Sequence, residues 1–172
     1  MQSIRCLTMT MATLLAVGCT SITSKESPAL PADARWALMP IVNYSQAPQA
    51  GERSEQILIS ILSKQNIQPQ VYPHSSNQDA VLLDDRERFA EAMTWARQRD
   101  FDYLVSGSVE EWQYKNGLDG EPAVGISLRV LEPSTGKVLW SNSAARAGWS
   151  RESLAGTAQK VLGELVDDLR IE

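Results

Sequence analysis

Few side chains in this 172-residue sequence could carry out catalysis or hold a metal ion. There are two cysteines, Cys6 and Cys19, and a single histidine, His74, in a polar loop that contains proline. A zinc site takes several histidine or cysteine ligands, so we expect neither a metal site nor a cofactor. No glycine-rich phosphate-binding loop is present, and the 21 acidic residues form no recognisable catalytic motif, although counting alone leaves a glycosidase pair open. We therefore expect a protein that is not an enzyme.

Cys19 stands where covalent modification, rather than catalysis, is expected. Before it come one basic residue, Arg5, a mostly apolar run from Leu7 to Val17, and the small residue Gly18. This arrangement is typical of a secretory signal with a cleavage site, and the run is too short to span a bilayer. The stretch LAVGC resembles the bacterial lipobox, in which the signal is removed before the cysteine and the cysteine is acylated. The alternative is an ordinary secretory signal followed by an unrelated cysteine.

Acidic side chains gather between Glu110 and Glu121, a segment that also holds Glu111 and Asp119 but only one basic residue, Lys115. An acidic lip of this kind attracts a cationic polymer. The alternative is a solvated hairpin whose charges only keep it in solution. The residues alone leave both interpretations open.

Trp149 lies between the last expected strand and the last expected helix. Tryptophan favours the membrane interface, where its apolar ring and its N–H group are both accommodated. In that case Trp149 is exposed in the isolated protein and touches lipid in the assembly. Alternatively, it precedes Ser150, the expected helix cap, and packs on Leu154 as a hydrophobic staple. Position alone does not decide between these two.

The spacing of apolar residues predicts the elements that must position these side chains. Residues 36–42 suit a strand buried on both faces, with Pro40 at a bulge or an edge position. Later strands repeat apolar residues every two positions, and helices every three to four. The expected strands are 36–42, 70–72, 103–109 with an extension to 114, 124–130 and 137–147, and the expected helices are 52–65, 86 onward and 150 onward. This order predicts an α/β fold with a mixed sheet of about five strands and a C-terminal antiparallel meander, flanked by three helices.

Single residues indicate where a helix starts, where the chain turns and where two strands approach closely. Asp84-Asp85 precede the second helix, where carboxylates accept hydrogen bonds from free N–H groups. Asn116-Gly117 predicts a hairpin between two strands. Gly107 and Gly125, inside strands, indicate bulges or a close backbone approach. Three tryptophans within strands are expected in the core or in a subunit contact: Trp36, Trp112 and Trp140.

Removal of the first 18 residues leaves 154, which suffices for one compact domain. We divide the chain into a signal peptide at 1–18, the acylated cysteine with a flexible tether rich in Ser, Thr and Pro at 19–34, and a single periplasmic α/β domain at 35–172. Cys6 leaves with the signal, so no disulfide is expected in the mature chain.

The charge and the residue after the cysteine bear on location and partners. Arg5 leaves with the signal, so the mature chain has 15 basic against 21 acidic residues and a net charge of about −6. Such a domain is a poor partner for nucleic acid or an anionic membrane and a better one for a cationic partner. Thr20 follows the cysteine, rather than the aspartate that retains such lipoproteins in the inner membrane. We therefore expect the outer membrane, with the domain facing the periplasm.

Four stretches of the sequence resemble a known group of periplasmic lipoproteins. WALMPIV, ILISIL, DYLVSGSV and VLEPSTGKVLW are similar to the fold shared by the TolB N-terminal domain and the CsgG group. With the lipobox, the length, the tether and the Gly148-Trp149-Ser150 junction, the whole mature chain resembles the PelC family, outer-membrane lipoproteins of the Pel exopolysaccharide exporter.

The resemblance implies a non-enzymatic export component that forms a dodecameric ring at the inner face of the outer membrane. The ring would guide a cationic amino-sugar polymer toward an outer-membrane porin, PelB. It implies membrane contact for Trp149 and makes Asp119 and Glu121 candidates for guiding the polymer. A lipoprotein that docks on and regulates a cell-envelope enzyme is the alternative. A CsgG-like pore would need long membrane-crossing hairpins, which 154 residues do not supply.

Overall fold

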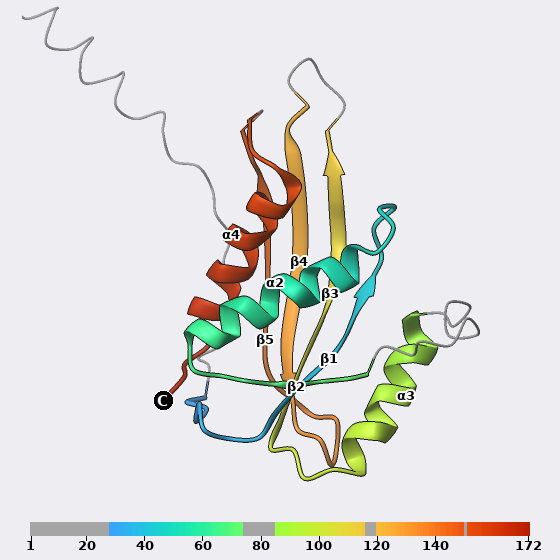
Figure 1. Ribbon diagram of the computed structural model, residues 1–172, viewed down its shortest axis with the longest axis vertical. Coiled ribbons are helices and arrows are strands. Elements are labelled where there is room, and N and C mark those ends of the chain that lie inside the picture. Colours follow the sequence, from blue (N-terminus) through green and yellow to red (C-terminus); the bar gives the residue numbers. More distant parts are fainter. Residues whose placement is uncertain (1–27, 74–84, 116–119, 150) are drawn as a thin grey trace, which may run out of the picture.

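The computed structural model describes residues 28–73, 85–115, 120–149 and 151–172 (Figure 1). A single five-stranded sheet of order β2-β1-β3-β4-β5 organises these residues. In chain order the elements are β1 (Trp36–Asn43), α2 (Ala50–Lys64), β2 (Gln70–Val71), α3 (Asp85–Arg97), β3 (Tyr103–Tyr114), β4 (Pro122–Leu131), β5 (Val138–Ala147) and α4 (Leu154–Asp167). β1 runs parallel to β2 and β3, whereas β3, β4 and β5 are antiparallel. The predicted mixed sheet with a C-terminal meander and three helices is confirmed.

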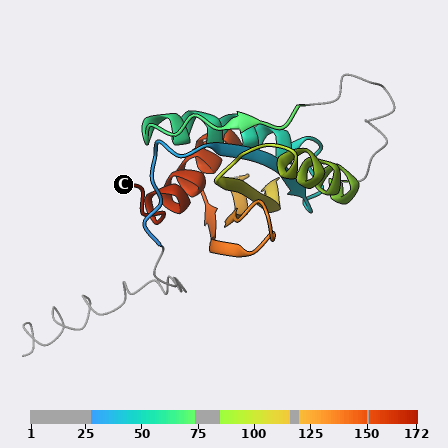
Figure 2. The same ribbon diagram turned by 90° about the horizontal axis from the view of Figure 1, so that it is seen from below.

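Helices cover the two faces of the sheet unequally. α2 and α4 pack on one face, where the larger apolar cluster lies, and α3 packs on the other face beside β1 (Figures 1 and 2). On that second face α3 covers β1 and reaches only the end of β4, where Leu131 joins the small cluster and Arg129 lies over the Phe89 ring. In the part of the chain that the structure describes, no helix lies over the rest of β4 or over β5 on this face. We call this uncovered part of β3, β4 and β5 the open face.

The alternation of apolar residues places the core as predicted. On β4, every second residue from Val124 to Val130 is at most 2% exposed and faces α2 and α4. β1 is buried on both faces, because Leu38 joins the large cluster while Ala37 and Met39 join the small cluster under α3. The three strand tryptophans are buried, as predicted: Trp36, Trp112 and Trp140.

The last helix begins later than the sequence suggested. The predicted cap, Ser150, lies outside the described residues, and the structure places the cap at Ser153. The Ser153 hydroxyl accepts a hydrogen bond from the Gly156 N–H at 3.1 Å, which satisfies one of the free donors of the first turn. Both positions carry serine, so composition alone could not separate them.

Carboxylates from two helices close the outer edge of β1. β2 pairs with β1 only at Ala37 and Leu38, and the register shifts at the Pro40 bulge, as predicted. Beyond the bulge, the Ile41 N–H donates to Glu55 of α2 at 3.0 Å and the Asn43 N–H donates to Asp85 of α3 at 2.8 Å. Asp85 lies in the first turn of α3, so the predicted helix start with an acidic residue is confirmed, but its carboxylate accepts this hydrogen bond from the strand. It serves the strand, because the edge of β1 otherwise lacks acceptors.

The first described residues are fixed to the end of the chain. The Leu30 N–H donates to the Arg170 carbonyl at 2.9 Å, and the Glu172 N–H donates to the Leu30 carbonyl at 3.0 Å. Leu30 is 3% exposed and belongs to the large cluster. The part of the chain that the structure describes thus begins beside the C-terminal end of α4. None of the helices that the structure describes is long and apolar enough to cross a bilayer.

Candidate functional site

Three strands end together at the end of the sheet that carries the β3–β4 hairpin (Figure 1). Tyr114 pairs with Pro122, and the Lys115 N–H donates to the Glu121 carbonyl at 2.7 Å. The Gly148 N–H donates to the Pro122 carbonyl, also at 2.7 Å, so the end of β5 lies at the same level. We call this region the hairpin end. It brings Glu121 and the segment around Trp149, separated in sequence, to one end of the molecule.

Gly148 lets the chain turn away from the sheet at this end. A side chain there would lie within 3 Å of Pro122, Glu152 and Thr157, so only glycine fits without a shift of its neighbours. Trp149 follows directly and is 76% exposed, which leaves most of its ring in solvent.

The staple interpretation of Trp149 does not fit this helix start. With Ser153 as the cap, the residue that precedes the cap is Glu152 rather than Trp149. The Glu152 carboxylate instead pairs with Lys160 at 2.7 Å, and the hydrogen bond from Lys160 lowers the pKa of Glu152 below its usual value.

Sequence reasoning missed a second exposed aromatic residue at the hairpin end. Tyr114 is 51% exposed, although Trp112, two residues earlier on the same strand, is buried. The signal was present in the sequence. Tyr114 is the last residue of β3 and lies on the same face as Trp112. A strand that extends beyond the helices packed on it exposes this face at its end. Tyr114 and Trp149 thus present two large apolar side chains at one end of the sheet.

The acidic segment does not form one continuous lip. A bulge between Val109 and Glu111 turns Glu110 and Glu111 toward the open face, several residues below the hairpin end. Glu121 is exposed at the base of the hairpin. Asp119 lies outside the described residues, as do Cys19 and His74.

Hydroxyl groups form a hydrogen-bonded chain across the open face. The Glu110 carboxylate accepts from the hydroxyls of Ser108, at 2.5 Å, and Ser127, at 3.0 Å. The Ser143 hydroxyl of β5 donates to the Ser127 hydroxyl at 2.8 Å. These polar groups are satisfied within the chain, so another surface can cover them at reduced desolvation cost.

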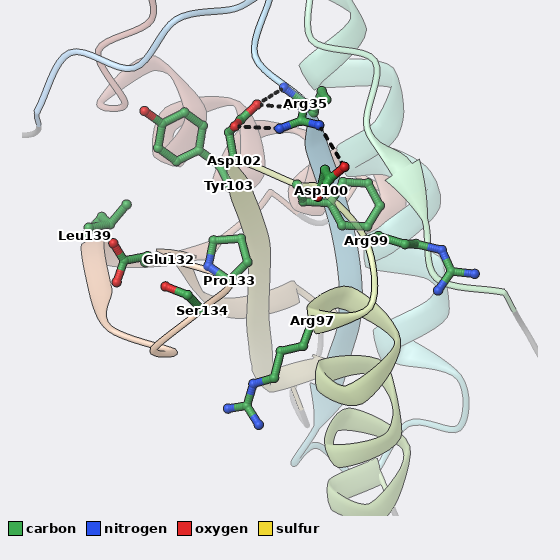
Figure 3. A pocket seen from close by; sticks show the side chains of 11 residues that line it. Arg35, Arg97, Arg99, Asp100, Asp102, Tyr103, Glu132, Pro133, Ser134 and Leu139 are labelled. Carbon is green, nitrogen blue, oxygen red and sulfur yellow. Dashed lines mark hydrogen bonds and ion pairs between the residues drawn. The ribbon is translucent and has the colours of Figure 1, made fainter.

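A cleft of about 740 Å³ lies at the opposite end of the sheet (Figure 3). There the Arg35 side chain donates to both oxygens of Asp102 at 3.2 Å and approaches Asp100 at 3.7 Å. The hydrogen bond from Arg35 holds the pKa of the Asp102 carboxyl below its usual range. These exposed pairs tie the start of β1 to the start of β3 and contribute little to stability. No residue predicted to act in function lines this cleft.

Among the described residues, no three His, Cys, Asp or Glu side chains come together as a metal-binding group. The candidate site is therefore a surface at the hairpin end: an exposed tryptophan, an exposed tyrosine and a hairpin whose base carries Glu121. Such a surface suits contact with a membrane or a polymer.

Comparison with known proteins gives a consistent result. No protein-family model matches the sequence, and no curated protein matches it. Among solved structures, the chain is similar to two PelC dodecamers from Paraburkholderia phytofirmans, one of them a single-substitution variant. The variant is 33% identical over 88% of this chain and 99% of its own, with a TM-score of 0.74. The other is 32% identical over 88% and 98%, with a TM-score of 0.72.

A more distant structure shares the fold alone. Lipoprotein GNA1162 from Neisseria meningitidis is 18% identical over 78% of this chain and 96% of its own, with a TM-score of 0.57.

Proposed function

The chain belongs to the PelC family, and on this premise we propose that it is a non-enzymatic lipoprotein of the Pel polysaccharide export apparatus. The observation that carries the proposal is the 33% identity to a PelC dodecamer over 88% of the chain. We place the protein at the periplasmic face of the outer membrane, anchored through acylated Cys19. The resemblance of LAVGC to a lipobox supports this location.

We further propose that the chain forms a ring that guides a cationic exopolysaccharide to an outer-membrane porin, PelB. The relatives in the solved structures are dodecamers, which supports a ring. A ring repeats each surface around a common axis, so weak contacts with a long polymer add up through multivalency.

The hairpin end is the part that we assign to the membrane. Trp149 and Tyr114 are exposed there, and both residue types favour the membrane interface. Leu30, near the start of the described residues, lies beside the far end of α4, whose 14 residues span about 21 Å. Pro28 follows Cys19 by nine positions in the sequence, a length that reaches at most about 30 Å. The acyl anchor and Trp149 can therefore meet the same membrane.

We expect Trp149→Ala to weaken membrane contact without unfolding the domain. Because the side chain is 76% exposed, its loss should change the free energy of unfolding by no more than about 0.5 kcal/mol. In the wild-type acylated protein, brominated lipids should quench the Trp149 emission. The Trp149→Phe variant provides the spectrum of the remaining tryptophans, so the difference isolates Trp149.

Tyr44→Ala is the matched control for Trp149. Tyr44 is 56% exposed but lies level with Val109, whose carbonyl accepts from its N–H. Along β3 this level is about 17 Å below Tyr114, so Tyr44 should stay away from lipid. A loss of roughly 3 kcal/mol on Trp149→Ala, or the absence of quenching at Trp149, would contradict the proposed membrane contact.

Asp119 and Glu121 are our candidates for contact with the cationic polymer. Glu121 is exposed at the base of the hairpin that contains Asp119. An exposed ion pair contributes at most about 1 kcal/mol, and salt screens it over a Debye length of about 8 Å. Weak contacts of this kind suit transport, because a tight site would stall a moving polymer.

The test of the function measures secreted polymer in three strains. A strain that lacks the chain should secrete none, and the wild-type chain should restore secretion. The double variant Asp119→Asn, Glu121→Gln should assemble normally but secrete less polymer. Its binding to the polymer should also depend less on salt, because two charged contacts are removed.

The outcomes separate the levels of the proposal. Normal secretion without the chain would overturn the export function, and a monomer bound tightly to one envelope enzyme would favour a regulator. Normal secretion by a correctly assembled double variant would eliminate only the hairpin as the guiding surface.

A further inference from the structure

We propose that the open face of one subunit packs against the face formed by α2 and α4 of the next subunit in the ring. The proposal rests on the ring that we propose above. It names the two surfaces of this chain that join its copies.

Ring geometry restricts which surfaces can meet. A ring of twelve copies, as in the dodecameric relatives, turns each subunit by about 30° relative to its neighbour. The two contact surfaces of a subunit must then lie almost opposite each other, about 150° apart. The open face and the α2–α4 face satisfy this condition, because they lie on the two sides of one sheet (Figure 2).

The two edges of the sheet are also opposite, but they are a poor choice. An edge-to-edge ring would pair β5 of one subunit with the β2 and β1 edge of the next. β2 has only two residues. Beyond it, the N–H groups of Ile41 and Asn43 already donate to Glu55 and Asp85. The carboxylates thus block the continuation of strand pairing along β1.

The open face is shaped for close contact with another surface. Gly125 on β4 pairs with Ala145 on β5. Neither residue has a side chain larger than a methyl group, so another surface can approach the two strands closely at this point. Ala147, next along β5, is exposed on the same side. The hydroxyl chain beside these residues is satisfied internally, and two carboxylates, Glu110 and Glu111, give the face a negative centre.

The α2–α4 face offers an open groove. A hollow of about 520 Å³ between the two helices is lined by Ile61, Lys64, Lys160, Gly163 and Asp167, among others. Lys160 is paired with Glu152 at 2.7 Å, and Lys64 and Asp167 carry opposite charges. A Cβ atom added at Gly163 would meet no atom within 4 Å, so the groove is open to a neighbouring subunit at this position. Small residues on one surface and an open groove on the other are complementary in shape.

Two tryptophan substitutions, one on each surface, test this arrangement in the acylated full chain purified in detergent. Ala145→Trp fills the open face and Gly163→Trp fills the groove, because Ala145 is exposed and a Cβ atom at Gly163 would meet no atom within 4 Å. Each variant alone should lose the ring and sediment as a monomer, with unchanged circular dichroism and thermal midpoint. Ala90→Trp, at an exposed position of α3 outside both surfaces, is the matched control and should keep the ring.

Mixing the two variants gives the sharper result. Ala145→Trp retains an intact groove and Gly163→Trp retains an intact open face. One copy of each variant can therefore form a single contact, between the groove of the first and the open face of the second. An equimolar mixture should therefore contain dimers with one copy of each, although each variant alone is monomeric. Because both variants must fold to form this dimer, the mixture also controls for misfolding.

Each outcome bears on a defined claim. A wild-type protein that is monomeric under these conditions would overturn the ring itself. A wild-type ring that survives Ala145→Trp or Gly163→Trp would leave the ring intact and overturn the proposed interface. Two monomeric variants that form no mixed dimer would also overturn the pairing of these two surfaces.

Discussion

Replacing Cys19 by serine is expected to move the protein from the outer-membrane fraction to the soluble periplasmic fraction. In our proposal the anchor is the acyl group on Cys19. A single acyl chain binds membranes only marginally, whereas several chains on one lipoprotein hold firmly. The exposed Trp149 adds one interfacial side chain, which cannot replace them.

The Cys19→Ser chain should remain folded, because the described core begins at Leu30 and uses no earlier residue. The measurement is fractionation of both forms, with circular dichroism of the soluble variant. Secretion should fall to the level of the strain that lacks the chain. A serine variant that still fractionates with the outer membrane would refute the lipid anchor.

Replacing Glu55 by alanine is expected to cost about 3 kcal/mol of unfolding free energy. The Glu55 side chain is 2% exposed, and its Oε1 accepts from the Ile41 N–H at 3.0 Å. The same oxygen lies 3.5 Å from the Arg88 guanidinium, which is itself only 16% exposed. Alanine would leave a strand N–H without this acceptor and a largely buried guanidinium with one partner fewer. Both changes are costly in the interior.

Two controls separate the causes of this loss. Glu52→Ala removes the other carboxylate that pairs with Arg88, at 3.1 Å, but the Glu52 side chain is 39% exposed. Its loss should cost less than about 1 kcal/mol. Glu55→Gln keeps an amide oxygen for the Ile41 N–H and should fall between the two. Urea unfolding at neutral pH measures all three, and equal losses for Glu52→Ala and Glu55→Ala would contradict the argument.

The fold class and the burial of most strands could be predicted from the sequence alone. Alternation of apolar residues depends only on the two-residue period of a strand, so the inward face of β4 could be predicted from its letters. The same holds for Pro40, because a residue without an N–H group must lie at a bulge or an edge. The membership in the PelC family could also be predicted from the whole mature chain, with its lipobox, length, tether and Gly148-Trp149-Ser150 junction, and the solved relatives confirm it.

The positions of the charged and aromatic side chains depend on tertiary contacts and could not be predicted from the sequence. A bulge of one residue turns both Glu110 and Glu111 to the open face, although sequence proximity grouped them with the hairpin tip. Asp85 serves the edge of β1, because a strand 42 residues earlier in the chain lies within reach of its carboxylate. Short-range patterns record the period of an element and the residues that start it. They do not show which distant backbone N–H groups lack an acceptor. In this protein such groups on β1 determine where the Glu55 and Asp85 carboxylates bind.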